Sequence, residues 1–177
     1  MAKSSRDKIK NDEGKILFEL KKDSKCSIGK LAKHVGFSRQ KVWRIVKRLE
    51  SKKIIWGETA VYDESFVGMD KYVLLVKVNG GYDDIAEVML KNEIIERLGI
   101  VVDDCFWMSG CYDYMLTFNA SDELSAKKVC QTVNGLLSTS ISSVVSVDMQ
   151  KVLITSRNRG VDAPDAENML KKIRAKA

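Results

Sequence analysis

Between residues 27 and 49, apolar side chains recur every three or four positions, which is the spacing of amphipathic helices. Gly36 separates two such stripes and can adopt the left-handed backbone that ends a helix. Ser27 and Ser38 precede the stripes as N-cap residues. The apolar positions are Ile28, Leu31, Ala32 and Val35 in the first stripe, and Val42, Ile45 and Leu49 in the second. This pattern predicts two short helices that cross at a tight turn, as in a helix-turn-helix.

The second predicted helix exposes polar side chains that suit the surface of DNA. We expect Gln40, Trp43 and Arg44 to lie near base edges, because they face away from the apolar stripe. The phosphate contacts are expected from Arg39, Lys41, Lys47 and Arg48. The cap residues Ser27 and Ser38 complete the predicted DNA-binding set. The alternative interpretation is a plain helical hairpin with a solvated basic face.

The sequence on either side extends this unit to a small domain. Residues 12–20 carry Ile16, Leu17 and Leu20 at helical spacing and predict a third helix. Residues 54–57 predict a short strand, so residues 1–57 form a winged-helix-like domain. Residues 58–70 are polar, contain Gly68 and predict a linker.

From residue 71 onward, runs of β-branched and apolar residues replace the helical spacing. The predicted elements are strands at 72–78, 101–108, 113–119 and about 142–154, a helix around 85–95, and a helix capped by Ser121 or Asp122. Their order, βαββαβ, predicts a ferredoxin-like α+β sandwich over residues 71–155. Because the strands are apolar on both sides, we expect the uncovered sheet face to form a dimer or a multiple of dimers.

Charge separates along the chain in the same way. Residues 1–57 contain 17 Lys and Arg against 6 Asp and Glu, whereas residues 58–156 contain 7 against 15. A basic N-terminal segment followed by an acidic segment is expected when one domain neutralises phosphates and the other does not. Residues 156–177 form a basic tail, for which a short helix is one interpretation.

Composition narrows the other functional classes. No apolar run approaches the roughly 20 residues that span a bilayer, and the charged N-terminus does not resemble a signal peptide, so a cytoplasmic location is expected. We expect no metal and no cofactor, since no ligand cluster or phosphate loop is present. The four cysteines form no CxxC pair and predict reduced, mostly buried thiols; they are Cys26, Cys105, Cys111 and Cys130.

The helix-turn-helix, Gly57, Gly68 and the Gly110-Cys111-Tyr112-Asp113 turn together resemble the leucine-responsive and asparagine regulator (Lrp/AsnC) family over roughly residues 9–155. The resemblance implies a DNA-binding first domain. It also implies a second domain, of the RAM type, that forms dimers and higher oligomers and binds small effectors, commonly amino acids. Cys111 stands where the family more often has a charged or polar residue. The expected function is an oligomeric, sequence-specific transcriptional regulator that responds to a small effector such as an amino acid.

The candidate effector-binding residues are Ser109, Gly110, Tyr112 and Asp113. Backbone N–H groups at Gly110 could hold a carboxylate, and Asp113 or the Asp103-Asp104 pair could hold an ammonium group. In the alternative interpretation Gly110 only makes the turn and Asp113 bonds to local backbone. Asp103 and Asp104 are neighbours in a strand, so we expect them to point to opposite faces.

Two other functions stay open at this stage. One is a ligand-independent protein that coats DNA. The other is an enzyme of modified-haem decarboxylation, a role found in a branch that resembles the same family. That chemistry is expected to need an exposed histidine in the second domain, whereas the single histidine, His34, lies in the first predicted helix of the helix-turn-helix. We therefore predict that the protein is not an enzyme.

Overall fold

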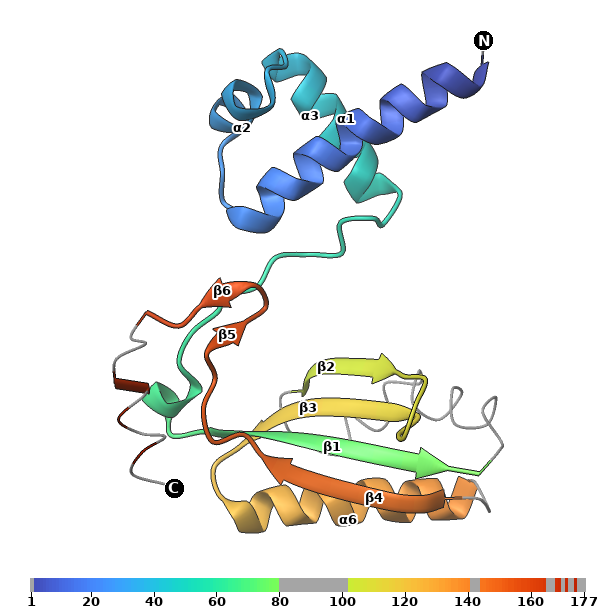
Figure 1. Cartoon of the computed structure of the whole chain (residues 1–177), viewed down its shortest axis with the longest axis vertical. Coiled ribbons are helices and arrows are strands. Elements are labelled where there is room, and N and C mark those ends of the chain that lie inside the picture. Colours follow the sequence, from blue (N-terminus) through green and yellow to red (C-terminus); the bar gives the residue numbers. More distant parts are fainter. Residues whose placement is uncertain are drawn as a thin grey trace. The chain divides into compact units, whose positions relative to one another are not determined.

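The computed structural model describes residues 2–79, 102–140, 144–164, 168, 169, 171 and 174 (Figure 1). The chain divides into two compact units. The first consists of Met1–Val61 and Arg157–Ala163, and the second of Tyr62–Ser156 and Pro164–Ala177. None of the described helices is both long enough and apolar enough to cross a membrane.

Three helices form the core of the first unit: α1 (Ala2–Lys22), α2 (Ile28–Val35) and α3 (Arg39–Ser51). The predicted apolar stripes meet the first helix in one core, whose buried members are Ile16, Leu31, Ala32, Val42, Ile45 and Leu49. The predicted helix-turn-helix is therefore confirmed. Helix α1 is longer than the 12–20 segment that the apolar spacing indicates.

The residues that begin and end α2 and α3 act as the sequence predicts. The Oγ atoms of Ser27 and Ser38 accept hydrogen bonds from the backbone N–H groups of Lys30 and Lys41, each at 3.3 Å. Gly36 has φ of +70°, and its backbone N–H donates a hydrogen bond to the carbonyl of Ala32 in α2. A side chain at this position would strain the left-handed backbone, which explains the glycine.

The strand predicted at residues 54–57 is wrong. The backbone N–H groups of Ile54 and Ile55 both donate to the carbonyl of Leu49, at 2.9 and 3.3 Å. They therefore satisfy the end of α3 rather than a neighbouring strand. Trp56 follows in irregular conformation and is 93% exposed.

The second unit contains a four-stranded antiparallel sheet with the order β2-β3-β1-β4. Its elements are the short 3-10 helix η1 (Glu64–Val67), strands β1 (Asp70–Val78), β2 (Val102–Trp107), β3 (Tyr114–Ala120) and β4 (Val144–Lys151), and helix α6 (Glu123–Ser140). This is the ferredoxin-like strand arrangement, so the predicted fold class is confirmed. The helix predicted around 85–95 lies outside the described residues.

Helix α6 covers one face of this sheet (Figure 1). Alternate residues of β1 and β3 point toward it, as a strand requires, and Tyr72 stacks on Phe118 with ring centroids 5.6 Å apart. Asp122 caps α6 by accepting a hydrogen bond from the N–H of Ser125 at 2.7 Å. The helix contributes Ala126, Val129, Val133 and Leu137 to the core.

A β-bulge in β2 overturns the expectation that Asp103 and Asp104 point to opposite faces. The pairing with β3 shifts between Val102 and Asp104, so one extra residue lies in the edge strand. Asp103 accepts a hydrogen bond from Asn119 at 3.1 Å, and Asp104 accepts one from Thr117 at 3.2 Å. Both carboxylates therefore lie on the sheet face opposite α6.

The sequence pattern does not predict the small hairpin in the basic tail. Strands β5 (Arg157–Asn158) and β6 (Val161–Asp162) pair antiparallel. The turn uses positive φ at Arg159 and Gly160, +47° and +85°, as two-residue hairpin turns require. Further along the tail, residues 168, 169, 171 and 174 are helical.

All four cysteines are free thiols. Cys26 and Cys130 are half-buried, and burial raises the pKa of the Cys130 thiol. Cys105 and Cys111 are exposed, so the prediction of mostly buried thiols is wrong for these two. The reason is their position, since Cys105 lies on the edge strand β2 and Cys111 lies in the following turn.

Candidate nucleic-acid interface

Helix α3 separates its buried and exposed residues cleanly. Val42, Ile45 and Leu49 are buried in the core of the first unit. At about 100° per residue, the opposite face of the helix carries Gln40, Trp43, Arg44 and Lys47, all of them exposed. Trp43 is 54% exposed despite its size. This face is the one available to an external surface.

Three exposed cations of α3 differ in their contacts. The guanidinium of Arg39 packs over Gly29 of α2, and its Nε is 3.2 Å from the position that a Cβ at Gly29 would occupy. A side chain at position 29 would require the Arg39 guanidinium to shift by a few tenths of an ångström. Lys47 pairs with Glu50 at 2.8 Å, but both side chains are exposed, so the pair is weak. In the described part of the chain, Arg44 forms no ion pair.

Lys41 and Arg48 are engaged within the domain. The Nζ of Lys41 lies 2.7 Å from Oδ2 of Asp12, and Nε of Arg48 lies 2.9 Å from Oε1 of Glu13. Both acids belong to α1. A cavity of about 420 Å³ lies beside these pairs, and its lining consists of Ile9, Asp12, Lys41, Arg44, Ile45 and Arg48. Two of the predicted phosphate contacts are thus already paired with carboxylates.

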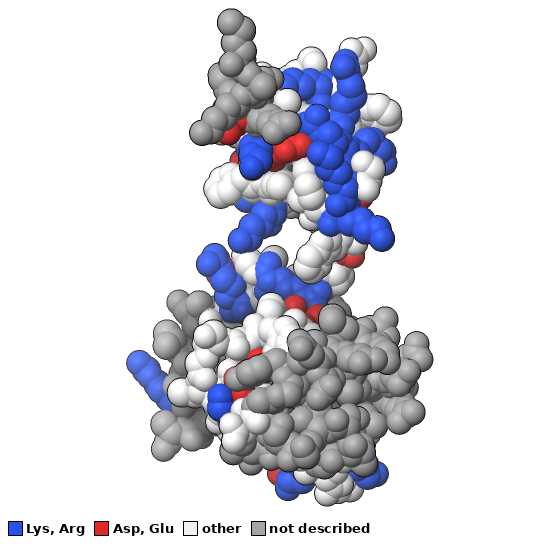
Figure 2. Space-filling model, turned by 90° about the vertical axis from the view of Figure 1, so that its right-hand side faces the viewer, with Lys and Arg blue, Asp and Glu red and all other residues white. Residues whose placement is uncertain are grey.

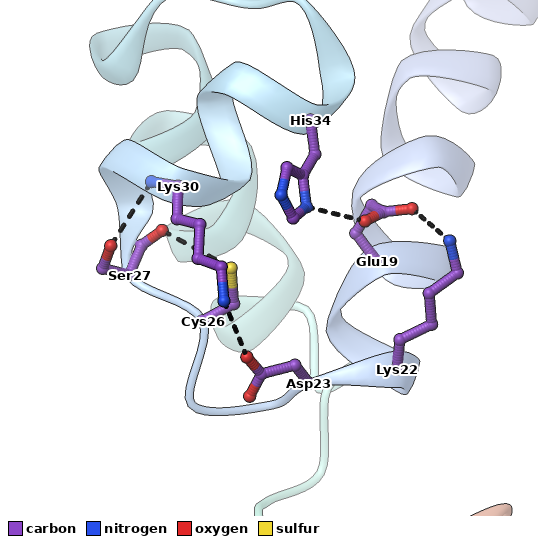
Figure 3. Close-up of polar contacts among 7 residues, drawn as sticks. All are labelled: Glu19, Lys22, Asp23, Cys26, Ser27, Lys30 and His34. Atoms are coloured by element: carbon purple, nitrogen blue, oxygen red, sulfur yellow. Dashed lines mark hydrogen bonds and ion pairs between the residues drawn. The ribbon is translucent and has the colours of Figure 1, made fainter.

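Polar contacts also join α2 to α1 (Figure 3). His34 Nδ1 lies 3.0 Å from Oε2 of Glu19, and Lys30 Nζ lies 3.7 Å from Oδ2 of Asp23. Lys22 is the main cause that lowers the pKa of Glu19, and His34 adds to it. The His34–Glu19 contact joins α2 to α1, whereas Asp23 lies just after α1 and its pair with Lys30 is exposed on both sides and therefore weak.

Lys and Arg side chains are spread over the N-terminal helices in the space-filling view (Figure 2). In the part of the first unit whose side chains are described, five acidic residues form ion pairs, and they are Asp12, Glu13, Glu19, Asp23 and Glu50. Because residues 1–57 contain 17 cationic residues, a large positive excess is left. Such an excess favours binding to a polyanion.

The predicted effector residues lie in the turn between β2 and β3. Asp113 is only 6% exposed, and its Oδ2 accepts a hydrogen bond from the backbone N–H of Val78 at 2.9 Å. The Nζ of Lys77 lies 3.0 Å from the same oxygen. The Val78 N–H and then Lys77 lower the pKa of Asp113, against the effect of burial. The carboxylate therefore holds the turn to the end of β1.

The other three members of this set differ in their surroundings. Ser109 and Gly110 are exposed, and Gly110 has φ of +147°. Tyr112 is half-buried and bonds to Asp148, whose carboxylate raises the pKa of the tyrosine. The turn thus leaves Ser109 and Gly110 open while Tyr112 and Asp113 are fixed to the sheet.

Comparison with known proteins agrees with this geometry. Residues 13–55 match the winged helix-turn-helix DNA-binding family. The leucine-responsive regulatory proteins of Escherichia coli K12 and Klebsiella pneumoniae are each 30% identical over 115 residues, which is 64% of this chain and 68% of theirs. These matches define a DNA-binding transcriptional regulator. The chain belongs to the Lrp/AsnC family.

Solved structures share the fold across both units. A leucine response regulatory protein of Mycobacterium tuberculosis superposes with a TM-score of 0.64 at 20% identity and covers 86% of this chain and 98% of its own. A transcriptional regulator of Neisseria meningitidis, solved as a complex with L-methionine, gives a TM-score of 0.60 at 20% identity, with coverages of 89% and 97%. A feast or famine regulatory protein of M. tuberculosis, also complexed with L-methionine, gives 0.63 at 20% identity, with coverages of 84% and 94%.

Sequence reasoning did not identify the part that Asp12 and Glu13 play at this interface. A signal was present, because both precede the buried Ile16 by three or four positions and therefore flank the buried stripe of α1. Two acids at the edge of a buried face, in a domain otherwise rich in cations, indicate pairing with a neighbouring helix. The identity of their partners depends on how α1 crosses α3.

Proposed function

We propose that this regulator recognises specific DNA sequences by placing α3 in the major groove. The observation that carries the proposal is the exposed face of α3, where Gln40, Arg44 and Lys47 lie opposite the buried stripe. The amide of Gln40 can form two hydrogen bonds with the edge of an adenine, and the guanidinium of Arg44 can form two with the edge of a guanine. Phosphate contacts from the surrounding cations then fix the helix in register.

We further propose that the protein acts as an even-numbered oligomer assembled through the second unit. Support comes from the sheet face opposite α6, where Val73, Leu75 and Met115 are half-buried and Phe106 is 47% exposed. Apolar side chains of this kind favour association with a second copy. Two copies would present two α3 helices to a pseudo-palindromic site with half-sites about 34 Å apart, or a multiple of this distance.

The proposed effector is a small amino acid bound near the turn at residues 109–113. Support comes from the two structural neighbours solved with L-methionine. In this chain Asp113 is occupied by Val78 and Lys77, so we expect the open residues Ser109 and Gly110 to contribute the contacts. Backbone N–H groups at the glycine suit a carboxylate.

The test is a binding selection from random duplexes with the full-length protein, repeated with each of the twenty amino acids, together with light scattering of the same sample. We expect the selection to enrich a pseudo-palindromic sequence and the scattering mass to correspond to an even number of subunits. One or a few amino acids should change the DNA affinity or the number of subunits. A clean monomer at micromolar concentration contradicts the assembly, and equal binding to all duplexes contradicts sequence recognition.

A ligand-independent, DNA-coating protein is the second candidate, and one observation favours it. The carboxylate that would hold an effector ammonium group is already bonded within the sheet unit. Such a protein should bind all duplexes with similar affinity and a steep dependence on salt, and no amino acid should change either quantity. The same selection therefore separates the two candidates.

A further inference from the structure

Helix α3 carries cations on two different sides. Arg44 and Lys47 lie on the exposed face, whereas Lys41 and Arg48 are half-buried on the flank that faces α1. Lys41 and Arg48 are seven residues apart, or about two helical turns, so they lie one above the other on this flank. Helix α1 places one carboxylate opposite each of them.

The carboxylates of both flanking pairs are largely shielded from solvent. The side chains of Asp12 and Glu13 are only 16% and 15% exposed. The ammonium of Lys41 also lies 3.7 Å from the centroid of the Phe37 ring, so it is held between a carboxylate and an aromatic face. Glu13 Oε1 and Arg48 Nε are both buried and lie 2.9 Å apart, but the pair is ionic and its geometry does not make a hydrogen bond. The exposed pair of Lys47 and Glu50 has no such enclosure.

This difference decides which cations can turn to DNA. An exposed pair contributes little, so Lys47 can leave Glu50 for a phosphate at small cost. A half-buried pair costs more to break, because the carboxylate that the cation leaves behind is poorly exposed to solvent. It would also lie close to the negative charge of the DNA backbone. Lys41 and Arg48 are therefore poor phosphate ligands while they are paired with Asp12 and Glu13.

We propose that Asp12 and Glu13 are positioning residues that set the specificity of DNA binding by withholding Lys41 and Arg48 from the phosphates. Phosphate contacts supply affinity for any sequence, whereas base contacts discriminate between sequences. Removing two phosphate contacts lowers non-specific binding and leaves the exposed face of α3 to decide the site. The inference rests on the proposed DNA recognition through α3.

The experiment measures binding of full-length wild type, Asp12→Asn and Glu13→Gln to a selected duplex and to a scrambled duplex at several salt concentrations. Each freed cation should tighten binding to the scrambled duplex about threefold to tenfold near 0.1 M salt and steepen the salt dependence by about one unit. The ratio of specific to non-specific affinity should fall. Asp7→Asn is the matched control, because it removes the same charge from an exposed position of α1; it should change binding less than twofold.

A second pair of variants tests whether the ammonium of Lys41 contributes to the salt dependence of DNA binding. Lys41→Ala in the wild-type background should leave the salt dependence unchanged, because that ammonium is already neutralised. Lys41→Ala combined with Asp12→Asn should return the steepened dependence to the wild-type value. A role in folding alone would lower the melting temperature without this reversal. Circular dichroism melts of every variant check that each one is folded.

Two results overturn the inference. One is weaker or unchanged binding of a folded Asp12→Asn variant to the scrambled duplex. The other is a salt dependence that falls by about one unit in Lys41→Ala alone, which decides the matter even if Asp12→Asn does not fold. If wild type binds the selected duplex normally in either case, only this inference fails. If wild type shows no preference for any duplex, the proposed function fails with it.

Discussion

The carboxylate of Asp113 accepts a hydrogen bond from the backbone N–H of Val78 at 2.9 Å, across 35 residues of sequence. The backbone of Asp113 makes two further bonds, donating to the carbonyl of Val76 and accepting from the N–H of Met108, each at 2.9 Å. The turn before β3 is therefore fastened to the end of β1 by one residue. That position lets its structural role be tested apart from any role in effector binding.

Replacing Asp113 by alanine should destabilise the second unit, which contains the sheet, by about 1–3 kcal/mol, because the buried N–H of Val78 loses its acceptor. Asp113→Asn keeps an oxygen that can accept this bond and should cost less. Urea unfolding followed by the fluorescence of Trp107 measures the effect. Trp43 and Trp56 are replaced by Phe in this experiment, so that only the second unit is observed. Basal DNA affinity of Asp113→Ala, measured with Trp43 and Trp56 in place, should stay within a few-fold of wild type, since α3 belongs to the other unit. Equal stability of the alanine and asparagine variants would contradict this account.

Acid should weaken the sheet unit through the same carboxylate. The Val78 N–H and Lys77 lower the pKa of Asp113 below its unfolded value, which is about 4. The stabilisation is therefore fully present above that unfolded value and is lost as the pH falls through the lowered pKa. Unfolding of wild type and Asp113→Asn between pH 3 and pH 7 tests this. The asparagine variant should show the smaller loss of stability on acidification.

Arg44 and Lys47 should differ in what they contribute to DNA binding. Arg44→Ala should cost roughly 1–3 kcal/mol at a selected site and relax the preference at one base pair. Lys47→Ala should weaken binding to all sequences alike and lower the salt dependence by about one unit. Binding to selected and scrambled duplexes over a range of salt separates the two effects. Identical behaviour of both variants on every duplex would show that the roles are not divided in this way.

Two glycines of the first unit should respond to alanine with opposite signs. Gly36 has φ of +70°, so Gly36→Ala should destabilise the domain by about 1–2 kcal/mol through backbone strain. Gly14 lies within α1, and a Cβ there would meet nothing within 4 Å. Gly14→Ala should stabilise the helix by about 0.5–1 kcal/mol. Thermal melts of both variants measure the difference, and a shift of the same sign in both would refute the argument.

Thiol labelling should divide the cysteines into two pairs. Cys105 and Cys111 are exposed, so they should react first with an aromatic disulfide reagent at neutral pH. Cys26 and Cys130 are half-buried, and the raised pKa of Cys130 slows its reaction further. Two fast and two slow equivalents per chain are the expected result, with mass spectrometry to locate the labels. Fast labelling of Cys130 would contradict it.

The local features of the first unit could be predicted because each depends on a few neighbouring residues. Ser27, Gly36 and Ser38 are fixed by the geometry of helix ends, and the apolar spacing then determines which sides of α2 and α3 are buried. In the second unit, the order of the strands along the chain follows from the runs of β-branched residues. The side-chain oxygens of Ser121 and Asp122 predict a cap at one of these two residues, and the structure shows that it is Asp122.

The remaining features depend on tertiary contacts that spacing does not contain. The pairing of Asp12 with Lys41 requires the crossing of α1 over α3. The bulge at Asp103 is stabilised by Asn119 and Lys71, which come from two other strands. Residues 54–57 have a strand-like sequence, but two of their backbone N–H groups donate to the carbonyl of Leu49 and are not available to a neighbouring strand.

The hairpin at Arg157–Ala163 belongs to the same compact unit as Met1–Val61, although the whole sheet lies between them in the chain. A ribosome therefore delivers the three helices first and the hairpin more than ninety residues later. Since domains begin to fold as they emerge, the helices can form their core early, while the hairpin joins only after the sheet has been synthesised. The core of the three helices, whose members all lie between Ile16 and Ile55, can therefore form without the hairpin.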